Sequence, residues 1–265
     1  MKNINKFITI GTFATLLTFS GCSATAKHSD KLKTTSQEHT SHWGYTGHND
    51  PSHWGNISPK YRECSQGKNQ SPINITAQDS VHANLKSIGF TYNTNSNSVI
   101  NNGHTVQVNI DQGSNISIDN KSFELKQFHF HTPSENEIGG KHFPLEAHFV
   151  HVDKNGDISV VAVMFKEGAT NQALENIWKN LPLKEGEKIA LSLSSQQINA
   201  ILPADKSYYR FSGSLTTPPC TEGVRWFLLK KPVSISKEQV EKFLNTMNHP
   251  NNRPIQNINA REVLY

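Results

Sequence analysis

The chain contains many short segments that are rich in β-branched and aromatic residues, and this pattern limits the possible folds more than any other feature. Gly, Asn, Asp and Pro separate the segments. The segments are residues 88–93, 105–110, 115–119, 122–131, 145–152, 158–165 and 224–233. Because short runs of this composition between turn residues are typical of strands, the sequence predicts a mainly β fold.

Two helices are predicted at the periphery of this fold. Residues 170–181 carry apolar side chains at helical spacing and end at Pro182. A second helix begins near Ser236, where Ser-x-x-Gln resembles a capping box. We expect both apolar faces to cover the core rather than to hold a cofactor.

The N-terminal residues 1–26 have the pattern of an export signal. Lys2 and Lys6 precede an uncharged apolar run, residues 7–19, that is too short to span a bilayer and leads into small residues. Two processing routes remain open: cleavage after Ala26, or lipidation of Cys22 within a lipobox-like sequence. The predicted location is periplasmic or secreted, with membrane attachment only through a lipid on Cys22.

The rest of the chain divides into a tether and one domain. Residues 27–41 are polar and form a flexible tether, and residues 42–265 have the length of one large domain. The net charge of +4 comes from scattered basic residues, so no nucleic-acid partner is expected. The oligomeric state stays open, with a homodimer as the candidate assembly.

Cys64 and Cys220 are an even pair in a chain predicted to leave the cytoplasm, where disulfides persist. A bond between them would close a long loop, for which the chain-entropy model gives roughly 4 to 5 kcal/mol of stabilisation. We expect the bond; the alternative is two buried thiols.

Two predicted strands carry histidines on the same face as a hydrogen-bond acceptor. In residues 127–131, Gln127, His129 and His131 share one face, and in residues 145–151 Glu146 and His148 share another. A His-x-His pair says little alone in a chain with 13 histidines. The acceptor two residues before a histidine is more informative, because it can hold one imidazole nitrogen and leave the other for a metal.

Three neutral histidines are typical of a catalytic zinc site. They leave Zn²⁺ its full charge and one open position for water, whose pKa can then fall to roughly 7. We therefore predict one Zn²⁺ per chain, bound by His129, His131 and His148. Taken alone, His148 is more often a structural histidine of the core or the surface than a metal ligand.

Two further residues suit chemistry at a zinc-bound hydroxide. If Thr216 donates its proton to Glu135, its oxygen can only accept from the hydroxide and so orients it. His104 follows a predicted turn and, titrating near neutrality, could pass a proton to solvent. The alternatives are an ordinary Thr-Pro loop and a surface histidine.

Together these motifs resemble the α-class carbonic anhydrases, in particular their bacterial secreted branch. The match runs through residues 42–45, 69–75, 101–104, 127–131, 146–151, 214–220 and 252–254. The resemblance implies a large, mostly antiparallel twisted sheet and the zinc-dependent reversible hydration of carbon dioxide to bicarbonate. It also implies a disulfide between Cys64 and Cys220.

The resemblance assigns site residues as well. His129, His131 and His148 match the zinc ligands, Thr216 and Glu135 the pair that orients the hydroxide, and His104 the proton shuttle. The other matches are a substrate contact at Thr217, a water path beside Tyr45, and an apolar wall of Val150, Val160, Leu215 and Val224. The chain departs from many animal members at Asn136, where they carry a histidine, and Glu137 competes with Glu135 for its role.

Two other classes of protein remain as rivals. His129, His131 and Glu135 also fit the metal motif of a cupin-like barrel, although the glycine expected at position 123 is a phenylalanine. A non-enzymatic zinc carrier is favoured by the histidine-rich stretch formed by His39, His42, His48 and His53.

Overall fold

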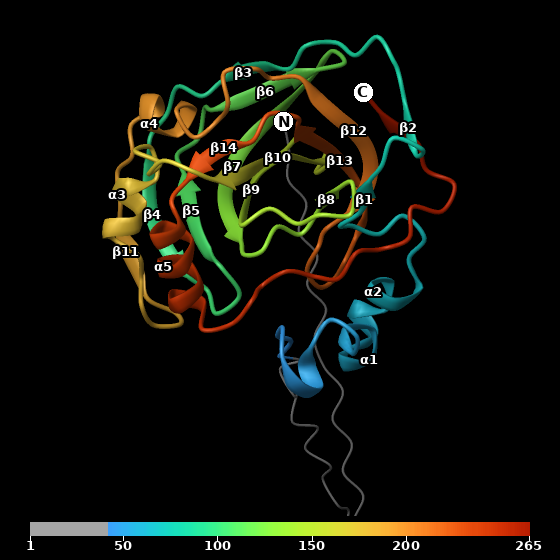
Figure 1. Ribbon diagram of the computed structural model, residues 1–265, viewed down its shortest axis with the longest axis horizontal. Helices are drawn as coiled ribbons and strands as arrows, with labels where there is room; N and C mark the ends of the chain where they lie inside the picture. Colours follow the sequence, from blue (N-terminus) through green and yellow to red (C-terminus); the bar gives the residue numbers. More distant parts are fainter. Residues whose placement is uncertain (1–41) are drawn as a thin grey trace, which may run out of the picture. The chain divides into compact units, whose positions relative to one another are not determined.

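The computed structural model describes residues 42–265 (Figure 1). The predicted export signal, the tether and Cys22 lie outside the described residues. The strands are β1 Asn74–Ile75, β2 Ser80–Val81, β3 Gly89–Thr91, β4 Ser96–Asn101, β5 Val106–Ile110, β6 Asn115–Ile118, β7 Lys121–His131, β8 Glu137–Ile138, β9 Leu145–Val152, β10 Ile158–Glu167, β11 Lys188–Ala190, β12 Tyr208–Ser214, β13 Glu222–Leu229, β14 Val233–Ile235 and β15 Val263–Leu264. The helices are η1 Gly47–Asn49, α1 Trp54–Ile57, η2 Pro59–Tyr61, α2 Glu63–Gln66, α3 Glu175–Lys179, α4 Ser195–Asn199 and α5 Lys237–Met247.

One 13-stranded sheet organises the described residues. Its main path is β11-β4-β5-β7-β9-β10-β13-β12-β15-β2, while β14 pairs with β10, and β6 pairs with β3 and β7. Three pairings are parallel, β10 with β13, β10 with β14, and β15 with β2, and the others in this sheet are antiparallel. The predicted mainly β fold with a mostly antiparallel sheet is therefore confirmed.

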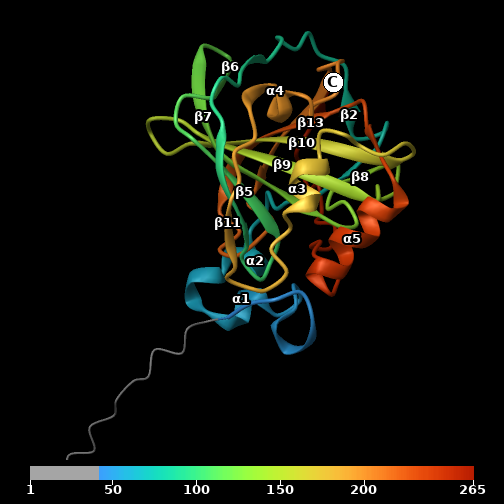
Figure 2. The same cartoon turned by 90° about the vertical axis from the view of Figure 1, so that its left-hand side faces the viewer.

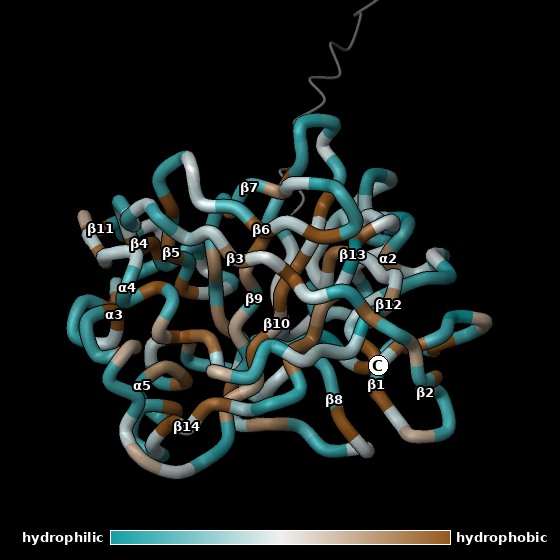
Figure 3. Tube along the Cα trace, turned by 90° about the horizontal axis from the view of Figure 1, so that it is seen from above, coloured by the Kyte–Doolittle hydropathy of each residue, from teal (hydrophilic) through white to brown (hydrophobic). Residues whose placement is uncertain are grey.

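The two faces of the sheet belong to different apolar clusters. Phe128, Phe130 and Phe149 lie in the larger cluster, whereas Val160 and Trp226 lie in a second one. Figure 3 shows the hydrophobic segments concentrated in the inner strands and the hydrophilic ones in the outer loops. Alternation along β7 thus sends the phenylalanines to one cluster and His129 and His131 to the opposite face.

The helices lie beside the sheet, as expected, but one is shorter than predicted. Helix α5 begins after Ser236, whose capping box with Gln239 is present. Helix α3 covers only Glu175–Lys179 instead of residues 170–181. A turn precedes it, in which the Asn171 side chain accepts from the Leu174 backbone N–H at 3.2 Å. Figures 1 and 2 show α3 and α5 next to each other. The ring of Trp178 on α3 lies 5.1 Å from that of Phe130, and the ring of Phe243 on α5 lies 5.9 Å from it, between centroids.

One predicted strand is divided in the structure. Residues 224–233 form the end of β13 and the start of β14, and Pro232, which has no N–H for a ladder, lies between them. Both strands pair with β10, at Ser159–Ala162 and at Phe165–Glu167. No helix within residues 42–265 is long and apolar enough to cross a membrane.

His151 makes the stability of the fold depend on pH. The ring is fully buried, its Nε2 lies 2.8 Å from the Tyr92 hydroxyl, and burial lowers its pKa from 6.5 to about 3. Between these values the unfolded chain binds a proton that the folded chain does not, so the free energy of unfolding should fall as pH drops below about 6.5. Urea unfolding at pH 7, 6 and 5 should show this loss, and His151→Gln should reduce the slope by about one proton, or roughly 1.4 kcal/mol per pH unit. An unchanged slope in that variant would contradict the assignment.

Candidate metal centre

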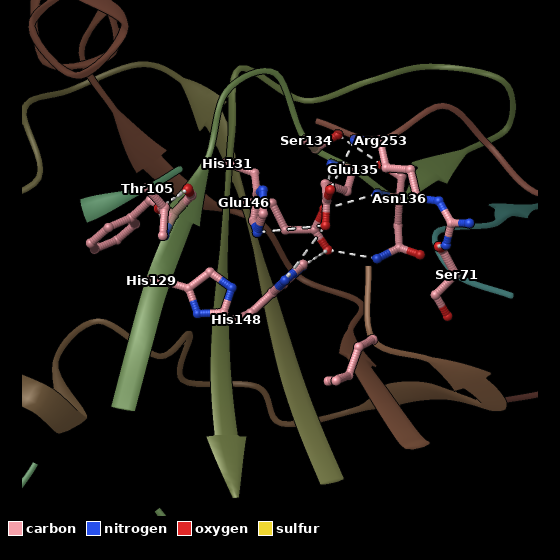
Figure 4. A network of polar contacts seen from close by, with 12 residues as sticks. Ser71, Thr105, His129, His131, Ser134, Glu135, Asn136, Glu146, His148 and Arg253 are labelled. Atoms are coloured by element: carbon pink, nitrogen blue, oxygen red, sulfur yellow. Dashed lines mark hydrogen bonds and ion pairs between the residues drawn. The ribbon is translucent and has the colours of Figure 1, made fainter. Parts of the chain in front are cut away.

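Three histidines converge near the middle of the sheet. β7 supplies His129 and His131, β9 supplies His148, and the strand register pairs His129 with His148. One nitrogen of each ring lies within 4.8 Å of the others, and this is the only group of three or more His, Cys, Asp or Glu with such geometry in residues 42–265. Figure 4 shows the three imidazoles gathered beside the Glu135 and Glu146 carboxylates. The grouping inferred from strand alternation is therefore present and has the geometry to hold a metal ion.

The two acceptors expected from the sequence contact their histidines. Gln127 Oε1 lies 2.8 Å from His129 Nδ1, and Glu146 Oε1 lies 3.0 Å from His148 Nε2. The first contact is a hydrogen bond, and the second is an ion-pair distance whose geometry falls short of a hydrogen bond. Together they leave His129 Nε2 and His148 Nδ1 as the atoms available to a metal.

The acceptor for the third histidine was missed by sequence reasoning. The backbone carbonyl of Asn251 lies 2.7 Å from His131 Nδ1. His131 Nε2 is buried and has no hydrogen-bond partner in the described part of the chain. Such an atom fits a metal ligand, because an unsatisfied buried nitrogen is otherwise unfavourable. No local pattern marks Asn251, although the neighbouring residues 252–254 belong to the family match.

The charge of the Glu146 carboxylate is stabilised by several donors. Its Oε2 accepts from the backbone N–H groups of Glu135 and Asn136 at 2.7 and 2.9 Å, and its Oε1 accepts from Asn136 Nδ2 at 2.8 Å. Burial alone would raise the pKa of Glu146, but His148 and these hydrogen bonds lower it overall. Asn136 therefore supplies an amide donor to Glu146 at the position where many animal members carry a histidine.

The surroundings keep two of the three histidines in the form that can bind a metal. Burial, with further contributions from His131 and His148, holds the pKa of His129 well below its usual range. Burial also lowers the pKa of His131, although the Asn251 carbonyl opposes this shift. Neutral imidazoles have the lone pair that a metal needs.

Glu135, rather than Glu137, lies next to the histidines. Its Oε1 accepts from the Arg253 backbone N–H at 2.9 Å, and its Oε2 lies 3.5 Å from His131 Nε2. Burial raises the pKa of Glu135 to about 7, against the opposing effects of His148 and of the Thr216 hydroxyl. Glu137 instead contacts His142 at 3.0 Å.

His104 lies on an aromatic surface formed by the first described residues. Its ring stacks on Trp43, with the centroids 3.6 Å apart and the planes at 10°. Burial, then His42 and His249, lower the pKa of His104 to about 4, against the opposing charge of Glu185. This differs from the near-neutral titration expected from the sequence, because the sequence does not show that the ring is half-buried against Trp43.

Tyr45 contributes to the same aromatic group. Its ring lies 5.7 Å from those of Trp43 and Trp54 and 5.9 Å from that of His249. The hydroxyl is buried without a hydrogen-bond partner in the described residues, and burial raises the pKa of Tyr45 well above its usual value.

The predicted apolar wall is gathered in one cluster. Trp226 belongs to this cluster and lies 4.9 Å from the His148 ring, between centroids. The register sets Val160 beside both Val150 and Trp226. The four predicted wall residues, all in this cluster, are Val150, Val160, Leu215 and Val224.

The predicted disulfide between Cys64 and Cys220 is present and joins positions 156 residues apart. Cys220 ends the loop that carries Thr216 and Thr217, and its backbone N–H donates to the Thr217 carbonyl at 2.9 Å. Arg253, which sequence reasoning did not single out, donates from Nη2 to the Cys64 carbonyl at 2.7 Å. The buried Arg253 thus contacts Glu135 through its backbone N–H and the disulfide-bonded Cys64 through its side chain.

Comparison with known proteins agrees with this geometry. A family model described as eukaryotic-type carbonic anhydrase matches residues 49–265. The chain belongs to the α-carbonic anhydrase family. A carbonic anhydrase of Pectobacterium atrosepticum is 46% identical over 96% of this chain and 99% of its own, and one of Neisseria gonorrhoeae is 49% identical over 84% and 87%. The α-carbonic anhydrase of Thermovibrio ammonificans, solved with the inhibitor sulfanilamide, has a TM-score of 0.83 and 50% identity over 84% of this chain and 99% of its own.

Membership in the α-carbonic anhydrases removes the cupin-like alternative. Glu135 also stands outside the group of convergent ligand atoms. The zinc-carrier alternative rested on a histidine-rich stretch. Three of its histidines, His42, His48 and His53, belong to no group of potential metal ligands among the described residues. His39 lies outside them.

Proposed function

We propose that this α-carbonic anhydrase converts carbon dioxide and water reversibly to bicarbonate and a proton at a Zn²⁺ held by His129, His131 and His148. The observation that carries the proposal is that one nitrogen of each imidazole lies within 4.8 Å of the others, while each ring also has an acceptor beside one of its nitrogens. Three neutral ligands leave one position open, and zinc, when bound, supplies hydroxide at neutral pH.

Thr216 and Glu135 are proposed to orient the attacking oxygen. The Thr216 hydroxyl interacts with Glu135, which is also held by the Arg253 backbone N–H at 2.9 Å. A hydroxyl that donates to a carboxylate can only accept from its other neighbour. Thr216 would therefore accept a hydrogen bond from the attacking hydroxide and fix its direction.

The apolar wall is proposed to hold carbon dioxide. Val160 and Val224 are almost fully buried, and Val150 and Leu215 pack against them. A neutral linear molecule gains little from charged contacts, so an apolar surface beside the metal suits it. Thr217, half-buried next to Thr216, is the proposed polar contact with the substrate.

Hydration of carbon dioxide before and after zinc removal tests this function. The holoenzyme should hydrate carbon dioxide in stopped-flow assays with a pH indicator, lose this activity after chelation, and regain it when zinc is added back. A zinc-loaded chain that does not exceed the uncatalysed rate would rule out the proposal. Activity unchanged by complete zinc removal would rule out the proposed metal chemistry.

His104 is the proposed proton acceptor, with Tyr45 beside the water path. The orientation stacked on Trp43 makes it a weak base, because burial lowers its pKa to about 4. In this orientation His104 is therefore a poor acceptor for a proton that leaves a group with a pKa near 7.

Trp43→Ala should consequently raise the pKa of His104 toward its ordinary value of 6.5. We expect kcat in weak buffer at pH 7 to rise about two- to fivefold, since a stronger base accepts the proton more readily. NMR titration of the His104 ring and stopped-flow assays measure the two effects. His104→Ala is the matching control: its turnover should fall in weak buffer and recover with imidazole. Equal rates of wild type and His104→Ala in every buffer would remove the shuttle role.

A periplasmic or secreted location is proposed on two grounds. The disulfide between Cys64 and Cys220 suits an oxidising compartment, and the bacterial relatives named above align with most of the chain. Mass spectrometry of the mature N-terminus would distinguish cleavage after Ala26 from lipidation at Cys22.

A further inference from the structure

One side of β7 lacks a strand partner where the strand carries His131. The β5–β7 ladder extends from Gln127 to His129, which pairs with Gln107. The backbone groups of Phe130 and Thr132 on that side must therefore find other partners, because buried N–H and C=O groups are unfavourable without hydrogen bonds. Asn251, with 0% of its surface exposed, supplies several of them.

The side chain of Asn251 bonds to β7 as a neighbouring strand would. Its Nδ2 donates to the Phe130 carbonyl at 2.9 Å, and its Oδ1 accepts from the Thr132 N–H at 2.8 Å. The Asn251 backbone N–H also donates to the Thr132 carbonyl at 3.1 Å, and its carbonyl contacts His131 Nδ1 at 2.7 Å. Asn251 therefore holds the backbone on both sides of His131 as well as its ring.

The same amide group reaches the turn that carries His104. Asn251 Nδ2 donates to the His104 carbonyl at 3.0 Å. Asn102 Oδ1 holds the other side of this turn by accepting from the backbone N–H groups of His104 and Thr105 at 3.0 and 2.9 Å. The Thr105 hydroxyl then donates to the Phe130 carbonyl at 2.6 Å, which closes the network.

We propose that the Asn251 side chain is a positioning residue that joins the His131 segment to the His104 turn and fixes the metal ligand and the proton acceptor in one arrangement. Both donors and the acceptor of the amide are used, so rotation of the side chain would leave several buried groups unsatisfied. The His131 half of this inference concerns metal binding, and the His104 half rests on the proposed function.

The test compares Asn251→Ala and Asn251→Asp with Asn171→Ala. Asn251→Asp keeps the size of the side chain but removes both donors. Asn171 is a matched control, since it is also a buried amide with several hydrogen bonds and lies by α3 and α5. Zinc release to a colorimetric chelator is followed from the folded holoenzyme, and circular dichroism reports the melting temperature.

We expect zinc to leave both Asn251 variants about 10-fold faster than wild type, the low end of the range found when partners of metal ligands are removed. Both variants keep the backbone carbonyl that contacts His131, but they lose side-chain hydrogen bonds that hold this carbonyl and the His131 segment in place. We also expect kcat in weak buffer to fall more than kcat/KM, because kcat in weak buffer includes the proton transfer. Asn171→Ala should lower the melting temperature and change neither quantity. Imidazole buffer should restore part of the lost kcat in the Asn251 variants.

Three outcomes would overturn the inference in whole or in part. Zinc release within twofold of wild type in a folded Asn251 variant would show that the Asn251 side chain does not position His131. A proportional loss of kcat and kcat/KM, with no recovery in imidazole, would show that the Asn251 side chain does not position His104. Equal acceleration of zinc release by Asn171→Ala would reduce Asn251 to a general stabilising residue. The release assay needs no substrate, so an inactive wild-type holoenzyme would contradict the proposed function without touching the His131 half.

Discussion

His148→Ala should lose zinc during ordinary purification and lower the rate of carbon dioxide hydration by at least about 1,000-fold. Its ring is one of only three that converge in the described residues, and two ligands hold a metal far more weakly than three. The loss should also leave the buried Glu146 carboxylate without the imidazole nitrogen that lies 3.0 Å from it. Metal content by plasma mass spectrometry and stopped-flow hydration measure the two effects on one sample.

His142→Ala is the control for that experiment. His142 contacts Glu137 at 3.0 Å and is not part of the convergent group. This variant should keep stoichiometric zinc and nearly full activity. If His148→Ala hydrated carbon dioxide as fast as His142→Ala, the assignment of the metal centre would be untenable.

Removing the disulfide should reduce the free energy of unfolding by about 5 kcal/mol, because the bond closes a loop between positions 156 residues apart. This is a large share of the roughly 5 to 15 kcal/mol that stabilises a typical domain. Guanidinium unfolding of the Cys64→Ser/Cys220→Ser variant, compared with the oxidised wild type, measures the difference.

The reduced wild type provides the control for the double variant. Its stability should match that of Cys64→Ser/Cys220→Ser, and added reductant should leave the variant unchanged. Equal free energies of unfolding for the oxidised and reduced wild type would show that the bond contributes nothing to stability.

Local patterns predicted those contacts of the metal centre that depend only on which face of a strand each residue occupies. In a strand, residues two apart share a face whatever surrounds them, so Gln127 with His129 and Glu146 with His148 could be paired from the sequence alone. The capping box at Ser236 is local in the same sense and is present in the structure. An equivalent box at Ser194, which begins α4, was overlooked although it has the same Ser-x-x-Gln pattern.

Features that depend on distant neighbours could not be predicted in this way. The turn before helix α3 is held by a partner 68 residues away, because the Asn171 backbone N–H donates to Gln239 Oε1 at 2.8 Å. Arg253 reaches the Cys64 carbonyl across 189 residues. No window of local sequence contains both partners of such contacts.

The sequence by itself therefore determined the mainly β character of the chain, the strand face that each of the three histidines shares with its neighbours, two of their acceptors, and motifs that match the α-carbonic anhydrases throughout the domain. The tertiary structure alone decided the third acceptor, Asn251, 120 residues from His131, and the low pKa of His104 against Trp43. The physical reason is that alternation is a property of the local backbone, whereas burial, stacking and buried hydrogen bonds arise only when distant segments pack together.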